Sequence, residues 1–476
     1  MVGGLGCGCG CECLDVRGYF FHCKREHMQQ HKILILLLVG GLLTGCEKFL
    51  DERPDKTATV PVTVQDAQAL LDNVTIVNSN WMWATHLYSD DVQVSSSAYA
   101  AVTNEAARQN YVWGDAADNA AQWMACYRRV YQANTVLAMI DRMPVADTAQ
   151  MAVRDVRGQA LFLRALSYYR LAQLFAVPYQ TGMADNGFGL PLVLTEDIGA
   201  GYVRSSIAST YEQMVKDVTA AVWLLPERAR FLTRASKPAA WALLARVALQ
   251  MGDMVLAAKA SAAGLEMQGS LLDYATLNAS ATVPFQRFNT EVLYHSTMSA
   301  GISNNVSRVD TGLYKLYAAD DLRKGLYWQR QPDGLYNFKG NYDGQVSGVY
   351  FDGLTTGELY LIRAESALAL GDRAGALGAL NQLLEKRWKR SSWVPLDIQD
   401  PGQLAERIRL ERRLELAYRG LRWPDIRRYW QTGVWKEGLR RQLDNNEYVL
   451  KPDSKRVTAL LPMVVVAMGG VVQNER

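Results

Sequence analysis

Apolar side chains recur at helical spacing along three long stretches of the chain. Residues three or four positions apart lie on one face of an α-helix, so each stretch predicts a helix with one buried face. We expect the aromatic residues of these stretches to pack in the core rather than to form a binding surface. The positions are Trp123, Tyr127, Val130, Asn134 and Leu137, then Leu161, Ala165, Tyr168, Ala172 and Phe175, then Tyr211, Val215, Val218, Val222 and Leu225.

A pattern of two Ala-rich stretches joined by Gly-Asp occurs twice. The copies cover residues 242–265 and 360–384, with the Gly-Asp dipeptide at 252–253 and 371–372. Small side chains allow two helices to pack closely, and glycine adopts the left-handed conformation that ends a helix. Neither copy carries a full consensus, but the repeat predicts paired helices of the tetratricopeptide type.

Three long stretches keep neither a helical nor a strand period. They cover residues 78–115, 178–204 and 266–350 and are rich in Gly, Asn, Asp, Ser and Tyr. Irregular connections of this length in a compact protein are usually either functional or disordered. Their many aromatic residues indicate order, so we expect the ligand-binding loops here.

A short apolar segment predicts export of the protein. Lys32 precedes the apolar run 33–39, which is much shorter than the roughly 20 residues that span a bilayer. The run leads into the sequence Leu-Leu-Thr-Gly-Cys at 42–46, which is typical of a lipoprotein box. Small residues before Cys46 admit a signal peptidase, and acyl chains such as palmitate on Cys46 would anchor the protein firmly. The alternative is a core helix that ends in Gly-Cys.

This signal divides the chain. Met28 begins a signal peptide of ordinary length, so we interpret the residues before it as an over-extended start and their five cysteines as neither a zinc site nor a disulfide framework. The expected division is an over-extended start at 1–27, a lipoprotein signal peptide at 28–45, a lipid tether and linker at 46–61, and a single domain at 62–476 with an amino-terminal helical part (62–265) and a carboxy-terminal part (266–476).

Composition then limits the function classes. The exported chain would run from Cys46 to Arg476, 431 of the 476 residues, which suffices for a large core. Removal of 1–45 takes away four basic and three acidic residues and changes the net charge from +3 to +2. A nearly neutral chain argues against a nucleic-acid partner. Only Cys46 and Cys126 remain, so an acylated Cys46 leaves no disulfide within the chain.

The stretch 408–428 reads IRLERRLELAYRGLRWPDIRR and resembles the carboxy-terminal signature of the SusD/RagB family of surface lipoproteins. It departs from that signature at Arg419, where the family usually has an acidic residue, and at Pro424. Further family-like pieces occur along the chain in the order in which the family has them. The resemblance therefore covers nearly the whole exported chain. These pieces are 46–51, 123–137, 160–174, 239–247, 320–323, 358–365 and 461–463.

The signature also has a physical interpretation as a structural element. Charges of opposite sign four residues apart predict two ion pairs along a helix, Arg407 with Glu411 and Glu415 with Arg419. We expect Arg422, Asp425 and Arg428 to pair around the end of that helix, and the apolar stripe to consist of Leu410, Leu414, Ala417 and Leu421. An anion site is the alternative, but the charges largely balance.

The resemblance implies a fold and a function. The fold would be mainly α, with tetratricopeptide-like helical hairpins as the scaffold and long irregular ligand-binding loops. SusD-like proteins sit on the outer leaflet of the outer membrane as a lid over a SusC-like TonB-dependent transporter. They capture oligosaccharides, or peptides in some members, and pass them inward without cleavage.

Sugar recognition requires flat aromatic faces that stack on pyranose rings, with polar groups beside them for the hydroxyls. Trp81 and Trp83 stand among amides in the sequence Asn-Ser-Asn-Trp-Met-Trp, and Trp328 precedes Gln-Arg. Burial in the core is the alternative for each of these residues. The candidate ligand-binding residues are Trp81, Trp83, Tyr99, Trp328, Tyr336 and Tyr342.

Two other functions must be weighed. The carboxylate pairs Asp90-Asp91 and Asp320-Asp321 suggest glycoside hydrolysis or a structural calcium ion. Adjacent residues do not normally converge on one bond, and no phosphate loop, nucleophile elbow or metal-spaced histidine pair is visible, so we predict neither catalysis nor a cofactor, with calcium as an open alternative. A scaffold that binds only proteins is a third possibility.

Overall fold

A helical hairpin and a third long helix form the first layer of the fold. The computed structural model describes residues 63–144, 147, 150–180, 182, 188–197, 199, 203–346 and 348–476. The three predicted helices are α8 (Ala120–Asp141), α10 (Met151–Phe175) and α11 (Ile207–Leu224), and both α8 and α11 pack on α10. Their apolar positions are buried or partly buried as predicted. The short helix α3 (Val64–Leu71) covers α8 and α10 near the beginning of the domain.

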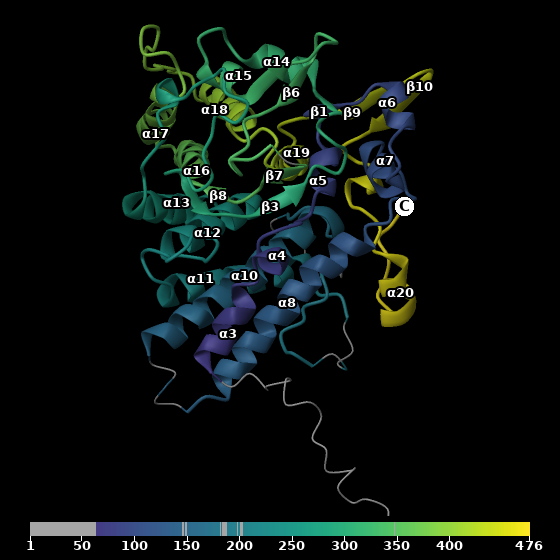
Figure 1. Cartoon of the computed structure of the whole chain (residues 1–476), viewed down its shortest axis with the longest axis vertical. Helices are drawn as coiled ribbons and strands as arrows, with labels where there is room; N and C mark the ends of the chain where they lie inside the picture. The colour runs from purple at the N-terminus through teal and green to yellow at the C-terminus, as the bar shows by residue number, and fades with distance from the viewer. Residues whose placement is uncertain are drawn as a thin grey trace, which may run out of the picture. The chain divides into compact units, whose positions relative to one another are not determined.

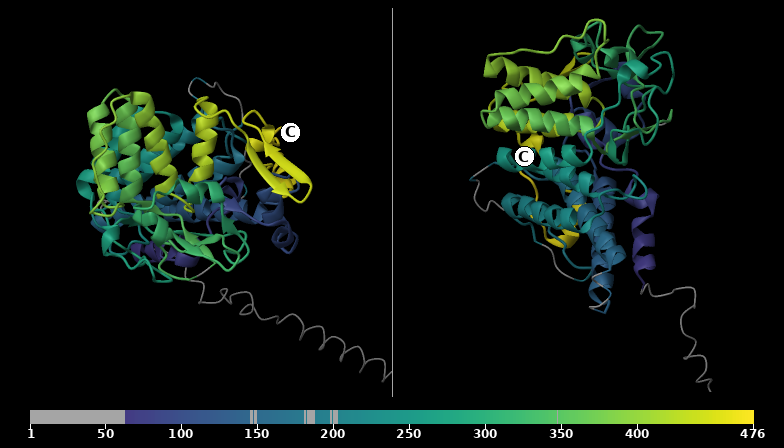
Figure 2. Two further views of the ribbon diagram at one scale, coloured as in Figure 1. Left: turned by 90° about the horizontal axis from the view of Figure 1, so that it is seen from above. Right: turned by 90° about the vertical axis from the view of Figure 1, so that its left-hand side faces the viewer.

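The two Ala-rich repeats are helical hairpins, as predicted (Figures 1 and 2). The first pairs α12 (Lys237–Met251) with α13 (Met254–Met267), and the second pairs α16 (Thr356–Ala369) with α17 (Arg373–Glu385). Gly252 and Gly371 take left-handed φ angles of 74° and 85° between the paired helices. Because α13 also packs on α16, successive helices form one stack, and the mainly helical fold of hairpins is confirmed.

The carboxy-terminal signature forms two helices rather than one. They are α18 (Pro401–Glu415) and α19 (Arg422–Gln431), separated by a turn in which Tyr418 and Gly420 have positive φ angles. A hairpin of β9 (Leu439–Leu443) and β10 (Asn446–Leu450), the short 3-10 helix η2 (Lys455–Val457) and α20 (Met463–Gly469) follow.

The stretches without a period contain short ordered elements. The first loop region, residues 74–115, contains α4 (Val74–Val77), α5 (Ala84–Tyr88), β1 (Val92–Gln93), α6 (Ser96–Ala100) and α7 (Glu105–Tyr111). The second loop region, residues 266–355, contains η1 (Tyr274–Thr276), β2 (Val292–Tyr294), β3 (Thr297–Ser299), β4 (Arg308–Val309), α14 (Thr311–Leu316), α15 (Leu322–Tyr327), β5 (Trp328–Arg330), β6 (Tyr336–Phe338), β7 (Val349–Phe351) and β8 (Leu354–Thr355). The strands pair only in twos, and β1 with β4 joins the two loop regions.

Buried ion pairs connect the carboxy-terminal signature to the rest of the core. Arg407 pairs with Glu411 at 2.7 Å, as predicted. The predicted pair of Glu415 with Arg419 is wrong, because Glu415 instead binds Arg387 at 2.9 Å and Arg323 at 3.3 Å. The helix ends at Glu415, so the spacing of four residues no longer places the two side chains together.

The three charged residues at the beginning of α19 do not form a single cluster, because they bind different partners. Asp425 and Arg428 approach to 3.4 Å, as expected, whereas Arg422 reaches across the fold to Asp90 at 2.7 Å. Asp425 also binds Arg412 of α18 at 2.8 Å. The signature is therefore a set of structural ion pairs that connect both helices with distant segments.

In the described part of the chain, no helix is long and apolar enough to cross a membrane.

Candidate functional site

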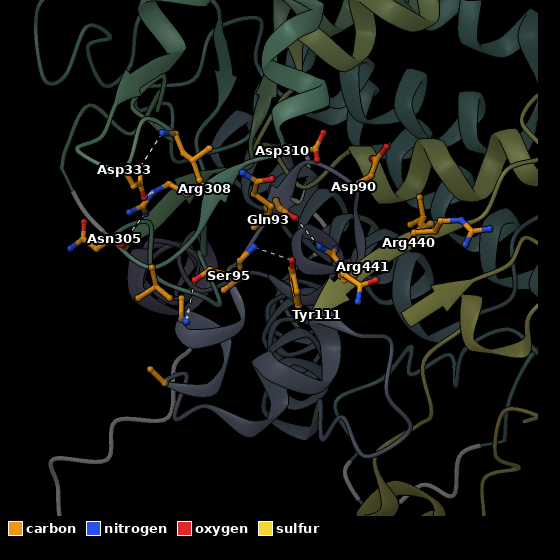
Figure 3. Close-up of a pocket in the computed structure, with 18 of the residues that line it drawn as sticks. Asp90, Gln93, Ser95, Tyr111, Asn305, Arg308, Asp310, Asp333, Arg440 and Arg441 are labelled. Atoms are coloured by element: carbon orange, nitrogen blue, oxygen red, sulfur yellow. Dashed lines mark hydrogen bonds and ion pairs between the residues drawn. The ribbon is translucent and has the colours of Figure 1, made fainter. Parts of the chain in front are cut away.

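A cleft of about 760 Å³ lies where the two loop regions meet the β9–β10 hairpin. The antiparallel pairing of Val92 with Val309 brings the first loop region beside the second. Arg308 and Asp310 come from β4 and its end, Asp333 from the turn between β5 and β6, and Arg441 from β9 (Figure 3). The cleft therefore draws on two of the three stretches in which we expected ligand binding. Its polar lining residues are Asp90, Gln93, Ser95, Asn305, Arg308, Asp310, Asp333, Arg413, Arg440, Arg441 and Gln442.

Arg441 lines the cleft and fixes two of its segments to each other. Its guanidinium donates hydrogen bonds to the backbone carbonyls of Leu87, Ser89 and Val92 at 2.6–2.8 Å. It lies 3.7 Å from the ring centroid of Tyr111 and 4.9 Å from that of Trp113. Arg441 is thus a structural residue that fixes β9 against the first loop region, and it covers the two aromatic rings of the cleft.

One wall of the cleft is fixed by an ion-pair cluster. Arg422 binds Asp90, and Arg413 binds both Asp90 at 3.0 Å and Asp91 at 3.2 Å. Burial alone would raise the pKa of Asp90, but Arg422 and Arg413 outweigh it and hold that pKa well below its ordinary value. Burial, partly offset by Arg413 and reinforced by Asp90, raises the pKa of Asp91 to about 6. Both carboxylates therefore have structural partners, and Asp91 is buried.

Two side-chain amides of the cleft are free to bind a ligand, whereas other polar groups already have a partner within the chain. Among the described residues, the side-chain amides of Gln93 and Asn305 make no hydrogen bond within the chain. Arg308 pairs with Asp333 at 2.8 Å, and Asp310 caps α14 through the Leu313 N–H at 2.9 Å. Amide, carboxylate and guanidinium groups along one cleft suit a ligand rich in hydroxyl groups.

Three predicted ligand-binding residues lie in the core, which is a correction. Trp81 is fully buried, and the Arg129 guanidinium lies 4.1 Å from its ring centroid. Trp328 is 3% exposed and packs in an aromatic cluster that includes Tyr418, 5.5 Å away between ring centroids. Tyr342 is buried and donates a hydrogen bond to Glu291 at 3.0 Å. These aromatic residues stabilise the loops from inside and present no face to a ligand.

The other three predicted residues are partly exposed, and ligand contact by them stays a prediction. Trp83 packs on Gly301, where an added Cβ would lie only 2.6 Å from the Trp83 ring. The Tyr99 ring centroid lies 5.9 Å from that of Tyr111 in the cleft. Tyr336 stacks on Tyr314 with 3.7 Å between ring centroids and follows Leu335, which lines the cleft.

Of the polar cleft residues, sequence reasoning singled out only Asp90, and it did so for catalysis or calcium binding. Gln93, Asn305 and Arg308 lie inside the predicted loop stretches, but nothing in their local pattern separates them from other loop residues. The hairpin residues Arg440 and Gln442 lie outside those stretches altogether. The β9 sequence Leu-Arg-Arg-Gln-Leu does not alternate apolar and polar residues, so the alternation of buried and exposed side chains along this strand appears only in the structure.

The open alternative of a calcium site gains no support from the second carboxylate pair. Asp320 binds Lys389 at 2.8 Å, and the buried Asp321 binds Arg323 at 2.7 Å. Within the residues that the structure describes, no group of three or more His, Cys, Asp or Glu side chains is placed to hold a metal ion. Cys46, the predicted lipid attachment site, lies outside the described residues.

Two family models match adjacent parts of the chain. Residues 48–249 match a SusD-like model described as starch-binding associating with outer membrane. Residues 286–460 match the SusD family model. The two matches leave only the beginning, a short middle segment and the carboxy-terminal end uncovered. No curated protein sequence matches the chain.

Solved structures of similar fold include proteins from three Bacteroides species. A SusD superfamily protein from Bacteroides thetaiotaomicron is 20% identical, with a TM-score of 0.71 over 87% of this chain and 100% of its own. A SusD-like carbohydrate binding protein from Bacteroides vulgatus is 20% identical, with a TM-score of 0.63 over 86% and 97%. A SusD superfamily protein from Bacteroides fragilis is 21% identical, with a TM-score of 0.67 over 86% and 99%. At these identities the likeness establishes the fold.

Proposed function

Because this chain belongs to the SusD/RagB family, we propose that it captures oligosaccharides in the cleft between its two loop regions and delivers them, uncleaved, to a SusC-like TonB-dependent transporter. The cleft itself is the observation that carries the proposal. Its volume of about 760 Å³ is within the roughly 300–1,000 Å³ of small-molecule sites. Its unpaired amides and its carboxylates can exchange hydrogen bonds with sugar hydroxyls. The similar Bacteroides vulgatus structure is described as a carbohydrate binding protein, which supports the same class of ligand.

The partners of Asp90 and Asp91 support capture without cleavage. An acid and base pair for glycoside hydrolysis needs two carboxyl groups on either side of the bond to be cleaved. Asp90 is held by Arg422 and Arg413, and Asp91 is buried behind it with Arg413 as its partner. Catalysis by this pair would require the loss of the ion pairs that build the cleft wall.

We place the protein at the outer membrane, anchored through acylated Cys46 and facing the cell exterior. The lipoprotein box at 42–46 supports the anchor, and the family model's description associates its members with the outer membrane. A lipid anchor with two or three acyl chains holds a protein to a membrane without a spanning helix. Contact with the transporter would complete the uptake complex.

The test is a calorimetric titration of the protein against a panel of oligosaccharides and peptides, followed by chromatography of the recovered ligand. We expect saturable binding of an oligosaccharide, weakened at least about tenfold by the double change Gln93→Ala and Asn305→Ala, because each lost hydrogen bond contributes about 1 kcal/mol. Gln329→Ala is the matched control, since Gln329 is an exposed amide that does not line the cleft.

Three outcomes would contradict the proposal. Cleaved ligand would indicate an enzyme, and saturable binding of a peptide alone would identify a peptide-capturing member of the family. Oligosaccharide binding that is equally strong in wild type and in the cleft variant would place the site elsewhere.

A further inference from the structure

Exposed apolar side chains surround the beginning of α10. Met151 is 83% exposed, Trp223 is 69% exposed and Phe231 is 52% exposed. Single exposed apolar residues are common on proteins, whereas several together indicate an interaction surface. Contacts of α10 show that these three residues belong to one region.

One hydrogen bond and one electrostatic interaction place the first turns of α10 beside Trp223 and Phe231. Arg154, one turn after Met151 on α10, donates a hydrogen bond to the backbone carbonyl of Trp223 at 3.1 Å. The next residue, Asp155, lies within electrostatic reach of Arg234, whose guanidinium is 5.5 Å from the ring centroid of Phe231. The first turns of α10 thus lie beside Trp223 and beside the segment that carries Phe231.

Arginines outnumber acidic residues in the segment that carries the exposed rings, where Glu227 is the one acid beside Arg228, Arg230 and Arg234. Arg154, Arg228 and Arg230 are exposed, and none of them makes an ion pair with another described residue. The Arg230 guanidinium lies 5.3 Å from the centroid of the Phe231 ring. Positive charges beside exposed aromatic rings are typical of surfaces that contact anionic lipid headgroups. We name this surface, consisting of Met151, Arg154, Trp223, Arg228, Arg230 and Phe231, the Trp223 patch.

The Trp223 patch lies where the proposed membrane tether enters the fold. Gln68 of α3 donates to Gln159 at 3.1 Å, and Gln159 donates to Asp155 at 2.9 Å. The end of α3 lies beside the patch, because Asp72 binds Arg234 at 2.6 Å and the Arg234 guanidinium lies over the ring of Phe231. An eight-residue helix is only about 12 Å long, so its first residue is also close. Figure 1 shows α3, α10 and α11 together at the lower end of the domain.

The tether limits how far this end can lie from the membrane. The 16 residues from 47 to 62 span at most about 55 Å when fully extended. An anchored domain therefore keeps the start of α3 within that distance of the lipid surface, and the exposed aromatic and basic side chains are at the same end of the domain. Tryptophan is enriched at the membrane–water interface because its ring is apolar and its N–H is polar.

We infer that the Trp223 patch rests on the headgroup layer of the membrane and so fixes the orientation of the anchored domain. The inference rests on the proposed lipid anchor, but the contact itself is a property of the folded domain. The domain without lipid should therefore bind anionic vesicles weakly and reversibly. A surface for the transporter protein is the competing interpretation, and it predicts no vesicle binding by this patch.

The test uses a chain that begins at residue 47, which lacks Cys46 and the apolar signal. The described core lies within residues 67–471, so the truncation removes no described core residue. Binding is measured by sedimentation with vesicles of phosphatidylcholine alone and with one quarter phosphatidylglycerol. We expect binding to the anionic vesicles that weakens as salt rises. The double change Trp223→Ser and Phe231→Ser should reduce it about tenfold or more, as should Arg228→Glu with Arg230→Glu.

A matched control comes from α20, which is also apolar and exposed but begins near the other end of α10. Ala459, close before α20, donates a backbone hydrogen bond to Leu174. Met468 and Val472 are 84% and 68% exposed, so Met468→Ser with Val472→Ser removes a comparable surface and should leave vesicle binding unchanged. Equal vesicle binding by wild type and by the Trp223 patch variants, or none by wild type, would overturn the inference. Oligosaccharide titration of the same variants keeps this result separate from the proposed capture function.

Discussion

Arg422 binds Asp90 through two hydrogen bonds, from Nε to Oδ1 at 2.7 Å and from Nη2 to Oδ2 at 2.9 Å. Arg422 begins α19 of the carboxy-terminal signature, and Asp90 lines the cleft more than 300 residues earlier in the chain. The signature is therefore more than a local packing device, because it fixes one wall of the candidate ligand site.

The change Asp90→Asn should destabilise the protein. It removes the negative charge that Arg422 and Arg413 share, and both arginines are largely buried. We expect the free energy of unfolding at pH 7 to fall by about 2–3 kcal/mol, somewhat less than for a fully buried pair because Asp90 is partly exposed. Urea denaturation followed by circular dichroism measures this difference, and an unchanged unfolding midpoint would contradict it.

The effect of Asp90→Asn should depend on pH in a defined direction. The pKa of Asp90 is lower in the folded state than in the unfolded chain. Its contribution is therefore fully present above the unfolded pKa of about 4 and is lost as the pH falls below that value. Melting temperatures of wild type and variant should converge between about pH 4 and pH 2. A difference in melting temperature that stays constant over this pH range would show that the charge of Asp90 does not cause the destabilisation.

His86 should make the protein sensitive to mild acid. Burial, and then the positive charge of Arg441, lowers the pKa of His86 to about 3. The unfolded chain takes up a proton near pH 6.5 that the folded state does not, so stability falls as the pH drops from about 7 to about 3. At pH 5 the loss from this residue is about 2 kcal/mol.

Replacement of His86 by phenylalanine tests this interpretation. The His86 ring packs against Tyr418 with 4.7 Å between centroids and against Tyr350 with 5.2 Å, so an aromatic ring can take its place. His86→Phe should remove the loss of unfolding free energy that His86 causes between about pH 7 and pH 5. Asp91, with its pKa of about 6, titrates in the same range in both proteins, so the difference between the two pH profiles isolates His86. Identical slopes for wild type and variant in this range would exclude His86 as the source.

The neighbouring tryptophans should behave differently. Trp81 is fully buried under Arg129, so Trp81→Ala should cost about 3–5 kcal/mol of unfolding free energy. Trp83 is only partly buried, and Trp83→Ala should cost less than half as much. Guanidinium denaturation of both variants provides the comparison, and equal losses would show that both rings belong to the core. Weaker oligosaccharide binding by a folded Trp83→Ala protein would support its predicted role in ligand contact.

The lipid anchor is tested by Cys46→Ala. The thiol of Cys46 is the predicted acylation site, so we expect the variant to lose stable membrane attachment while its melting temperature stays unchanged. Fractionation of cells, with washing at high salt to remove weak surface contacts, distinguishes the two forms. Full recovery of the washed variant in the membrane fraction would contradict the lipoprotein prediction.

Much of the scaffold could be predicted from the sequence, because helix formation depends on residues that are close along the chain. The spacing from Trp123 to Leu137 identified α8, and the dipeptide at 371–372 identified the end of α16. The pair of Arg407 and Glu411 lies within one turn of one helix and was predicted correctly. The family resemblance also depends on order along the chain and not on contacts in space.

The candidate site depends on contacts between residues that are far apart in the sequence. The pairing of Val92 with Val309 and the hydrogen bonds of Arg441 to the first loop region bring the cleft together. No local pattern shows whether a loop aromatic points inward, so Trp81 and Trp83 looked equivalent until their neighbours were known. The sequence by itself determined the helical scaffold and the family. The tertiary structure decided which side chains are buried, because burial is set by what the rest of the chain packs against them.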